Sequence, residues 1–290
     1  MLATRKDITV TQAREHEAPA CLALLPEIGG APAELLIARV DGEFAGAAGV
    51  VWASWAEPAG FHVAVRVLEA ARGRGVGRKL LMAASDLADG ETDGLWSFQA
   101  TPLDSPAAKF LEACGFAPRK RDHYFQIGVS RMLDHVGGIV RRYRERGHIP
   151  PGADVVFLSD VEAPLEEITW LIARELDNGP LVHPQTLRRR LVDSADRSMI
   201  ARFNGELAGV TLWRVEGGNA IADVRVVARQ WRSGWPNLLM METGLLRARE
   251  EGLEQIKFFS DEALNDTRNL AKRGEGQETD VKARYYLAFD

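Results

Sequence analysis

Residues Val63–Leu81 read VAVRVLEAARGRGVGRKLL, and this stretch decides how the fold is interpreted. An apolar, alternating segment leads into a turn with three glycines, and a helical pattern follows. Glycine lets the backbone approach an anion closely with its N–H groups, and a helix N-terminus adds partial positive charge. Arg72, Arg74 and Arg78 place further positive charge around the turn. The stretch therefore predicts a strand, a pyrophosphate-binding loop and a helix.

Two other phosphate-binding loops are excluded by their spacing. The P-loop signature, G-x-x-x-x-G-K-[ST], does not occur in the chain. The dinucleotide fingerprint needs a third glycine three residues after its second glycine. Counted from Gly73 or Gly75, that position holds Arg78 or Leu80. The loop therefore belongs to neither class.

The chain contains an internal repeat. The segment IARVDGEFAG at 37–46 returns as IARFNGELAG at 200–209, 163 residues later, and Val65-Arg-Val67 returns as Val224-Arg-Val226, 159 residues later. In the longer match, apolar arms flank Asp-Gly or Asn-Gly, a dipeptide that supplies the positive φ angles of a type I′ hairpin turn. Two ordered matches at nearly equal offsets predict that one folding unit has been duplicated.

The composition is that of an ordinary globular protein of about two domains, with 290 residues and a net charge of −5. It has two cysteines, too few for a disulfide framework or a zinc cluster, and no apolar run of bilayer length. The basic run at 141–146 is interpreted as a solvated helix face. We expect a cytoplasmic protein that binds no metal, nucleic acid or membrane.

Hydrophobic periodicity, turn residues and helix signals divide the chain into the same order of elements twice. The predicted domains are 1–130 and 153–290, joined by a helical connector over 131–152 that ends in a Pro-Pro-Gly cluster. The predicted strands are 7–13, 61–68, 94–101, 123–129, 154–158, 220–228, 255–260 and 281–289, with hairpins at 35–55 and 198–215. The predicted helices are 15–28, 76–89, 105–113, 164–177, 183–193, 237–251 and 265–273.

The run from Val67 to Gly77 closely resembles the acyl-CoA motif R/Q-x-x-G-x-G/A of the GNAT superfamily of N-acetyltransferases, with Arg72 in first place. Ala107–Phe116, AAKFLEACGF, is similar to the late helix of that family, and the element order also resembles its fold. The resemblance covers nearly all of residues 5–130. It implies an α/β (α+β) protein of two tandem GNAT folds, each a mixed, mostly antiparallel central sheet flanked by helices.

The resemblance also implies a function and a binding site. Acetyl-CoA would be the co-substrate, and the backbone N–H of Val67 would polarise the thioester carbonyl while a deprotonated amine attacks directly. The acceptor would be a primary amine on a small molecule or a peptide. The implied cofactor-binding residues are Val65, Arg66, Val67, Arg72, Gly73, Arg74, Gly75, Val76, Gly77 and Arg78.

The catalytic acid and base are less well marked. Members of the family often carry a tyrosine acid on the late helix, where this chain has Leu111. His62 is a candidate base, although it alternates to the other side of a regular strand and only a bulge would re-aim it. Packing is the alternative interpretation of His62. Asp104 is a candidate for orienting a water or the amine, or for capping the helix from Ser105.

The second copy departs from the motif. An ungapped alignment at offset 159 places Trp231 at Arg72, Gly234 at Gly75 and Pro236 at Gly77. Because proline has no N–H, one donor of the loop is lost. We therefore expect a degenerate second copy that keeps the fold and has lost the cofactor. A monomer is plausible because the tandem mimics a dimer, although the sequence leaves the oligomeric state open.

Three functions remain open from the sequence. The first is N-acetyl transfer from acetyl-CoA to a primary amine, with the active site in the N-terminal half. The alternative is a non-catalytic CoA-binding regulatory or sensor module, which the leucine at the tyrosine position favours. Transfer of a longer acyl group is a third option. Nothing in the sequence identifies the acceptor amine.

Overall fold

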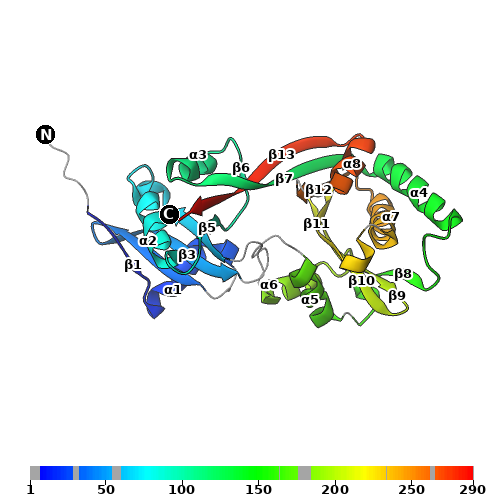
Figure 1. The fold of residues 1–290 in the computed structure, drawn as a ribbon, viewed down its shortest axis with the longest axis horizontal. Coiled ribbons are helices and arrows are strands. Elements are labelled where there is room, and N and C mark those ends of the chain that lie inside the picture. The colour runs from blue at the N-terminus through cyan, green and yellow to red at the C-terminus, as the bar shows by residue number, and fades with distance from the viewer. Residues whose placement is uncertain are drawn as a thin grey trace. The chain divides into compact units, whose positions relative to one another are not determined.

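A computed structural model describes residues 7–28, 33–53, 60–162, 164–175, 184–232, 234–261 and 265–289. Its strands are β1 (Ile8–Gln12), β2 (Glu34–Val40), β3 (Glu43–Ala53), β4 (Gly60–Val67), β5 (Gly94–Ser97), β6 (Thr101–Pro102), β7 (Ala117–Gly128), β8 (Ala153–Phe157), β9 (Met199–Phe203), β10 (Glu206–Glu216), β11 (Asn219–Val227), β12 (Gln255–Asp261) and β13 (Gln277–Ala288). Its α-helices are α1 (Ala18–Leu24), α2 (Val76–Ala88), α3 (Pro106–Ala113), α4 (Val129–Glu145), α5 (Leu165–Glu175), α6 (Pro184–Asp193), α7 (Trp235–Glu250) and α8 (Asn265–Arg273). Figure 1 traces these elements along the chain.

The chain packs into two compact units that are not simple consecutive halves. Unit 1 comprises 1–120, 178–186 and 283–290, and unit 2 comprises 121–177 and 187–282. Both β7 and β13 therefore contribute residues to each unit. The predicted domains 1–130 and 153–290, with their connector, remain a prediction about the chain's functional division.

Unit 1 has a sheet in the order β1-β2-β3-β4-β5-β13, whose pairs are antiparallel except for β4 with β5. The sheet is buried on both faces. On one face α2 packs over it (Figure 1), and Leu80, Leu81 and Ala84 of α2 belong to the same buried apolar cluster as Val63 of β4. On the other face, α1 and the 3₁₀ turn Pro26–Ile28 cover a second apolar cluster. The apolar side chains of its strands thus contribute to two cores, one on each face of the sheet.

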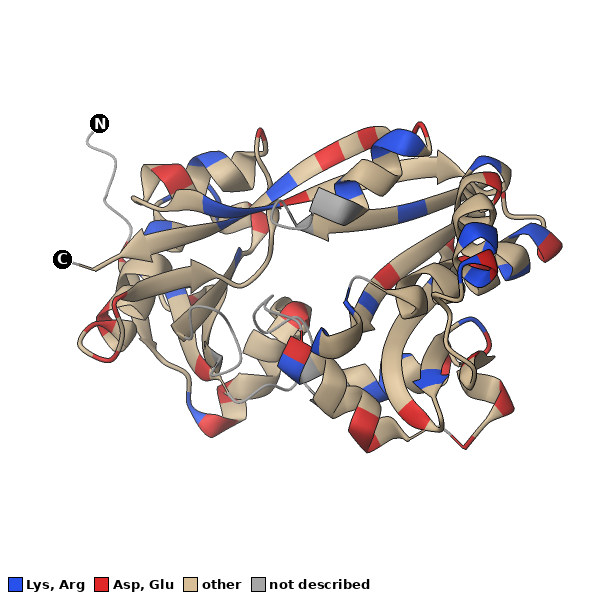
Figure 2. Cartoon of the chain, turned by 45° about the vertical axis from the view of Figure 1, so that its right-hand side comes forward, with Lys and Arg blue, Asp and Glu red and all other residues tan. Residues whose placement is uncertain are grey.

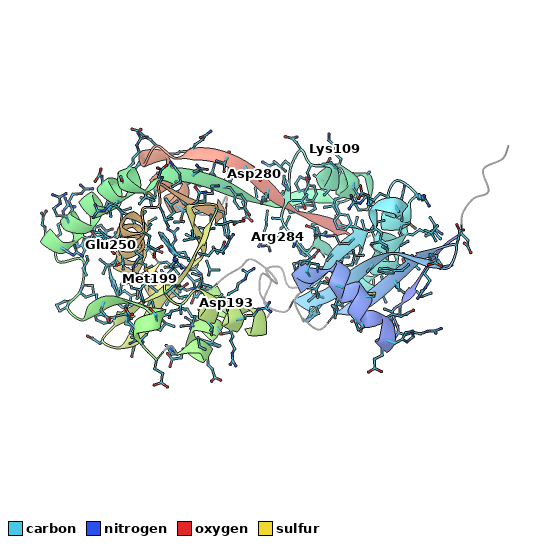
Figure 3. All side chains as sticks on the ribbon, turned by 180° about the vertical axis from the view of Figure 1, so that it is seen from behind. Lys109, Asp193, Met199, Glu250, Asp280 and Arg284 are labelled. Atoms are coloured by element: carbon cyan, nitrogen blue, oxygen red, sulfur yellow. The ribbon has the colours of Figure 1, made fainter. Side chains whose placement is uncertain are left out.

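Unit 2 repeats the arrangement with the order β7-β12-β11-β10-β9-β8, in which β11 and β12 form the parallel pair. Its core is a cluster between the strands and the helices α4 and α7. Met199 of β9 lies in this core with no exposed surface, as Figure 3 shows. The basic run at 141–146 lies in the exposed last turns of α4 and beyond (Figure 2), as expected of a solvated face.

The predicted fold class is confirmed, because each unit has a mixed, mostly antiparallel sheet flanked by helices. Most predicted elements also occur within a few residues of their expected bounds. The main differences are β7, which begins at Ala117 rather than at His123, and β13, which begins at Gln277 rather than at 281. In unit 2 the extension of β13 lies beside β7, where His123 forms a hydrogen bond with Glu278 and Thr279 Oγ1 donates to Tyr124 O. No described helix is both long and apolar enough to cross a bilayer.

The two hairpins share details that alignment alone does not show. Asp41 and Asn204 have φ angles of 54° and 52°, and the glycine after each has a φ of 88°, so both turns have the positive angles of type I′. Each long strand also carries one bulged alanine, Ala45 in β3 and Ala208 in β10. Shared bulges support the duplication, because a bulge is a specific built feature of a sheet.

Strand pairing corrects the shorter repeat match. Gly46 pairs with Val67, and the corresponding Gly209 pairs with Val227, so the offset in this region is 160 residues. The cause is a bulge at Asp223 in β11 that β4 lacks. Arg225 therefore corresponds to Val65, and Val226 corresponds to Arg66. The offset of 159 used for Val65-Arg-Val67 was wrong by one residue.

In the loop before α7 the offset between the two copies returns from 160 to 159 residues. The 3₁₀ turns Glu69–Ala71 and Arg229–Trp231 are 160 residues apart, whereas the helix N-caps Gly75 and Gly234 are 159 apart. The second loop is thus one residue shorter. The helix starts confirm the placement of Gly234 on Gly75 and of Pro236 on Gly77, but Trp231 falls on Ala71 rather than on Arg72.

Candidate functional site

The candidate site begins where β4 and β5 separate. Their parallel pairing ends at Val63 with Ser97, followed by a hydrogen bond from Phe98 N to Val63 O of 2.8 Å. The remaining residues of β4 continue to pair with β3, but no β5 residue faces them. The strands therefore open into a cleft in the sheet.

Two backbone amides of β4 point into this cleft. The N–H and C=O of one strand residue point to the same side, and successive residues alternate. Because Val63 O faces β5, the backbone groups of Val65 and Val67 face the same side. Their carbonyls accept 3.2 Å hydrogen bonds from the side chains of Arg66 and Arg72, and neither amide has a protein acceptor among the described residues. These amides are available to a ligand.

The glycine loop continues from this edge. Gly73 and Gly75 have φ angles of 72° and 88°, in the left-handed region that favours glycine. A Cβ built on either would meet no atom within 4 Å, so backbone conformation, rather than crowding by protein atoms, requires these glycines. Gly75 caps α2, whose first hydrogen bond runs from Lys79 N to Gly75 O. Within the described residues, the amides from Gly73 to Arg78 have no protein acceptor.

Gly77 is needed for a different reason. A Cβ on Gly77 would lie 3.0 Å from Cζ of Phe110, a residue of α3. The missing side chain lets α3 approach the start of α2. The loop thus combines free backbone donors, an exposed helix N-terminus and close packing against α3, which is the geometry of an anion-binding loop.

A pocket joins the loop side of the sheet to its α1 side. Its wall on the side of α2 and α3 is apolar and includes Val65 of β4, Leu81 of α2 and Leu111 of α3. Its other wall is polar. The described lining residues are Glu27, Val63, Ala64, Val65, Arg66, Leu81, Ser97, Phe98, Gln99, Thr101, Ala107, Phe110 and Leu111.

Glu27 is the acidic residue of this lining, and the sequence analysis did not identify it. Its side chain is only 5% exposed, and Oε1 lies 2.8 Å from Arg66 Nη2. The angle of approach is not that of a hydrogen bond, so Oε1 makes an ion pair but remains without a hydrogen-bond donor. Arg66 also donates to Gln99 Oε1 at 3.3 Å. A buried carboxylate with an unused oxygen therefore faces the cleft.

His62 lies on the face of β4 shared with Ala64, and β4 has no bulge that would re-aim it toward the α2 side. It is 2% exposed, its ring stacks on Trp96 with centroids 6.4 Å apart, and it does not line the pocket. Burial and then the positive charge of Arg284, labelled in Figure 3, lower its pKa to about 3, against a weak opposing effect of the Ser97 backbone. So low a pKa disfavours proton uptake, and its role as base stays an untested prediction.

The structure also places the other two positions of interest. Ser105 caps α3 by accepting a 3.1 Å hydrogen bond from Ala108 N, so the predicted capping by Asp104 was wrong. Asp104 is exposed and outside the described pocket lining, and its catalytic role stays a prediction. Leu111 lines the pocket with an apolar side chain. The pocket hydroxyls come from Ser97 and Thr101 instead.

The last strand of the chain supports this site. Tyr286–Ala288 of β13 pairs with β5, and Tyr285 N donates to Ser97 Oγ at 2.9 Å. Tyr285 is fully buried, and its hydroxyl lies 3.3 Å from Glu112 Oε1 on α3. The C-terminal strand thus fixes the edge of β5 on the side away from the cleft.

Residues 6–116 match the family model described as the acetyltransferase (GNAT) family, and this range contains the split strands, the loop and the late helix. Over these residues the chain is similar to the GNAT family of acetyltransferases. No curated protein sequence matches the chain significantly. The GNAT domain therefore stands on the family match and on the geometry of the cleft and loop.

Solved structures extend the likeness in fold to the whole chain. A GCN5-related N-acetyltransferase from Sphaerobacter thermophilus is 16% identical with a TM-score of 0.55, covering 99% of this chain and 97% of that one. A tandem GNAT protein from the clavulanic acid biosynthesis pathway is 16% identical with a TM-score of 0.56, covering 98% of both chains. A GCN5-related N-acetyltransferase from Kribbella flavida is 12% identical with a TM-score of 0.57, covering 97% and 72%. At these identities the likeness is one of fold.

Proposed function

We propose that the GNAT domain of this chain binds acetyl-CoA and transfers its acetyl group to a primary amine. The observation that carries the proposal is two sets of backbone donors without a protein acceptor among the described residues, Val65 and Val67 on β4 and Gly73–Arg78 in the loop that follows. An acyl-CoA has an amide-containing arm and a diphosphate, and these groups need such donors in this order. The side chains of Arg72, Arg74 and Arg78 would add positive charge near the diphosphate.

The residues on the α1 side of the cleft suit an amine acceptor. Glu27 would accept a hydrogen bond from the ammonium form and then take up the proton that the amine must lose. Arg66 would hold this carboxylate in place through their ion pair. The amide of Val67 would stabilise negative charge on the acetyl oxygen.

The departing thiolate needs no strong protein acid. An ordinary thiol has a pKa of about 8.5, so thiolate is a tolerable leaving group near neutral pH. Leu111 therefore does not rule out catalysis. The thiolate would leave as such and take up a proton from bulk water. A cytoplasmic location stays a prediction from the sequence.

The test measures binding and turnover separately on the full chain. Saturating acetyl-CoA at a hundred times its Kd should stabilise the protein by about 2.7 kcal/mol, visible as a rise of several degrees in Tm. A panel of small amines, amino sugars and peptides should then release free thiol. No shift in Tm with acetyl-CoA would contradict the proposal. Firm CoA binding without thiol release on any amine would instead favour a CoA-binding regulatory module.

A further inference from the structure

Unit 2 has a pocket beside the loop that corresponds to the glycine loop of unit 1. Its volume is about 310 Å³, and its walls come from α4, the end of β11, the start of α7 and α8. We call it the arginine pocket, after Arg225, Arg232 and Arg273 in its lining. His135 of α4 and two asparagines, Asn237 and Asn269, also line it. No Asp or Glu occurs among the described lining residues.

Arg225 is the central observation. Its Nη2 donates to Thr267 Oγ1 at 2.5 Å and its Nη1 lies 3.9 Å from Met241 Sδ. Among the described residues it forms no ion pair with a carboxylate, and burial lowers the pKa of its guanidinium. A partly buried guanidinium with no counter-charge among the described residues is destabilising. Such a group is explained if a ligand supplies the negative charge.

The neighbouring groups are also of the kind that binds an anion. Arg273 has no carboxylate partner within the described residues, whereas Arg232 is balanced by Glu175 at 3.0 Å. Nε2 of His135 is buried and has no hydrogen-bond partner among the residues that the structure describes. Asn237 stands in the first turn of α7, where partial positive charge also favours an anion, and its Nδ2 donates one hydrogen bond to Arg232 O at 3.1 Å. Donors from one strand and three helices therefore converge on the pocket.

We propose that the arginine pocket binds a small phosphate-bearing molecule through Arg225 and Arg273, independently of the acetyl-CoA site in unit 1. Arginine matches phosphate oxygens with two parallel donors, and amide and imidazole groups add uncharged donors of the kind found here. The arginine pocket would bind the phosphate group of its ligand, and it would not bind the extended arm of CoA. In the second cleft a guanidinium occupies the position of Val65, and Pro236 has removed an amide of the loop.

The test uses the full chain loaded with saturating CoA, so that the unit 1 loop is already filled. Sodium pyrophosphate is then titrated, with sodium chloride and sodium citrate at matched ionic strength in parallel. We expect pyrophosphate alone to raise Tm, by about 5 °C at a hundred times its Kd. Stabilisation by citrate but not by pyrophosphate would overturn the assignment to phosphate.

Two variants separate a ligand site from a structural contact. Arg225→Met keeps the length of the side chain and removes the charge. It should raise the Tm of the anion-free protein and weaken pyrophosphate binding by about 10- to 100-fold in calorimetry, because one charged hydrogen-bonding group is lost. Arg141→Met, on an exposed position of α4 outside the described pocket lining, is the matched control and should change neither quantity.

Three results would overturn the proposal. The first is CoA-loaded protein that does not respond to pyrophosphate. The second is an unchanged response in Arg225→Met. The third is a lower Tm of Arg225→Met without the anion together with normal pyrophosphate binding, which would make Arg225 a structural tie to Thr267. Binding of CoA to the wild-type protein is measured before the titration, so failure of the acetyltransferase proposal is recorded separately.

Discussion

The two clefts of the molecule have the same backbone architecture but different side chains. Each opens where a parallel pair of strands ends, and each lies beside a 3₁₀ turn and a helix capped by glycine. In unit 1 that glycine, Gly75, is left-handed with a φ of 88°, whereas Gly234 in unit 2 is extended with a φ of −115°. The first cleft has Val65 and a buried acid, Glu27. The second has Arg225 in place of Val65.

This difference indicates that the fold and the site depend on different residues. The paired bulges, the type I′ turns and the apolar faces are retained in both copies, and these set the sheet and its core. The residues around the cleft differ: the second copy has Pro236 in its loop and a guanidinium, that of Arg225, at the position of Val65. Function therefore follows from the site and not from the shared fold.

The largest expected effect tests the acid that only the first cleft contains. Glu27→Gln keeps the shape of the side chain and removes the proton acceptor, so kcat/KM should fall by about 10²- to 10⁴-fold while acetyl-CoA still binds. Thiol release and calorimetry measure the two quantities. Glu43→Gln, on the exposed hairpin, is the control and should be fully active. Full activity of Glu27→Gln would remove this carboxylate from the mechanism.

The second effect concerns His62, whose counterpart by strand pairing is Ile221. Its folded pKa of about 3 lies below the unfolded value of 6.5. The unfolded state therefore binds the extra proton between these values, and stability falls as pH decreases from about 6.5 toward 3. The expected loss between pH 7 and pH 5 is about 2 kcal/mol, at roughly 1.4 kcal/mol per unit.

Urea unfolding of the wild-type protein and of His62→Ile at both pH values measures this loss. The variant carries the residue of the second copy and should lack the His62 contribution, although other groups still titrate. Equal pH dependence in the two proteins would show that His62 is not a buried neutral imidazole.

The smallest effect compares the two cap glycines. Alanine at Gly75 must adopt a left-handed conformation, which costs about 1–2 kcal/mol, so acetyl-CoA affinity should fall by about 5- to 30-fold as the loop relaxes. Gly234→Ala needs no such conformation, and its nearest Cβ neighbour would be Trp231 O at 3.3 Å. Its effect should stay within about 0.5 kcal/mol. Calorimetry with acetyl-CoA compares them, and equal losses would mean that both loops hold the ligand.

Much of the fold could be predicted because its signals are local. Glycine and Asp-Gly or Asn-Gly turns, apolar periodicity and helix starts depend on a few neighbouring residues, and they located nearly every element. The starts of β7 and β13 were missed because both are rich in charged residues and lack apolar alternation; Glu278 at the start of β13 pairs with His123 of β7 rather than with a core. Glu27 was missed because a lone glutamate after a short helix carries no local signal.

The sequence by itself determined the duplication, the glycine loop and the order of helices and strands, since each is written in short-range patterns of backbone freedom and apolar spacing. Only the tertiary structure decided the register at Asp223, which exchanges the faces of Arg225 and Val226, because a bulge is seen only when two strands are paired. It also decided that Tyr285 and the end of β13 complete unit 1. Contacts between residues far apart in the chain depend on how the strands assemble, and no local pattern encodes that assembly.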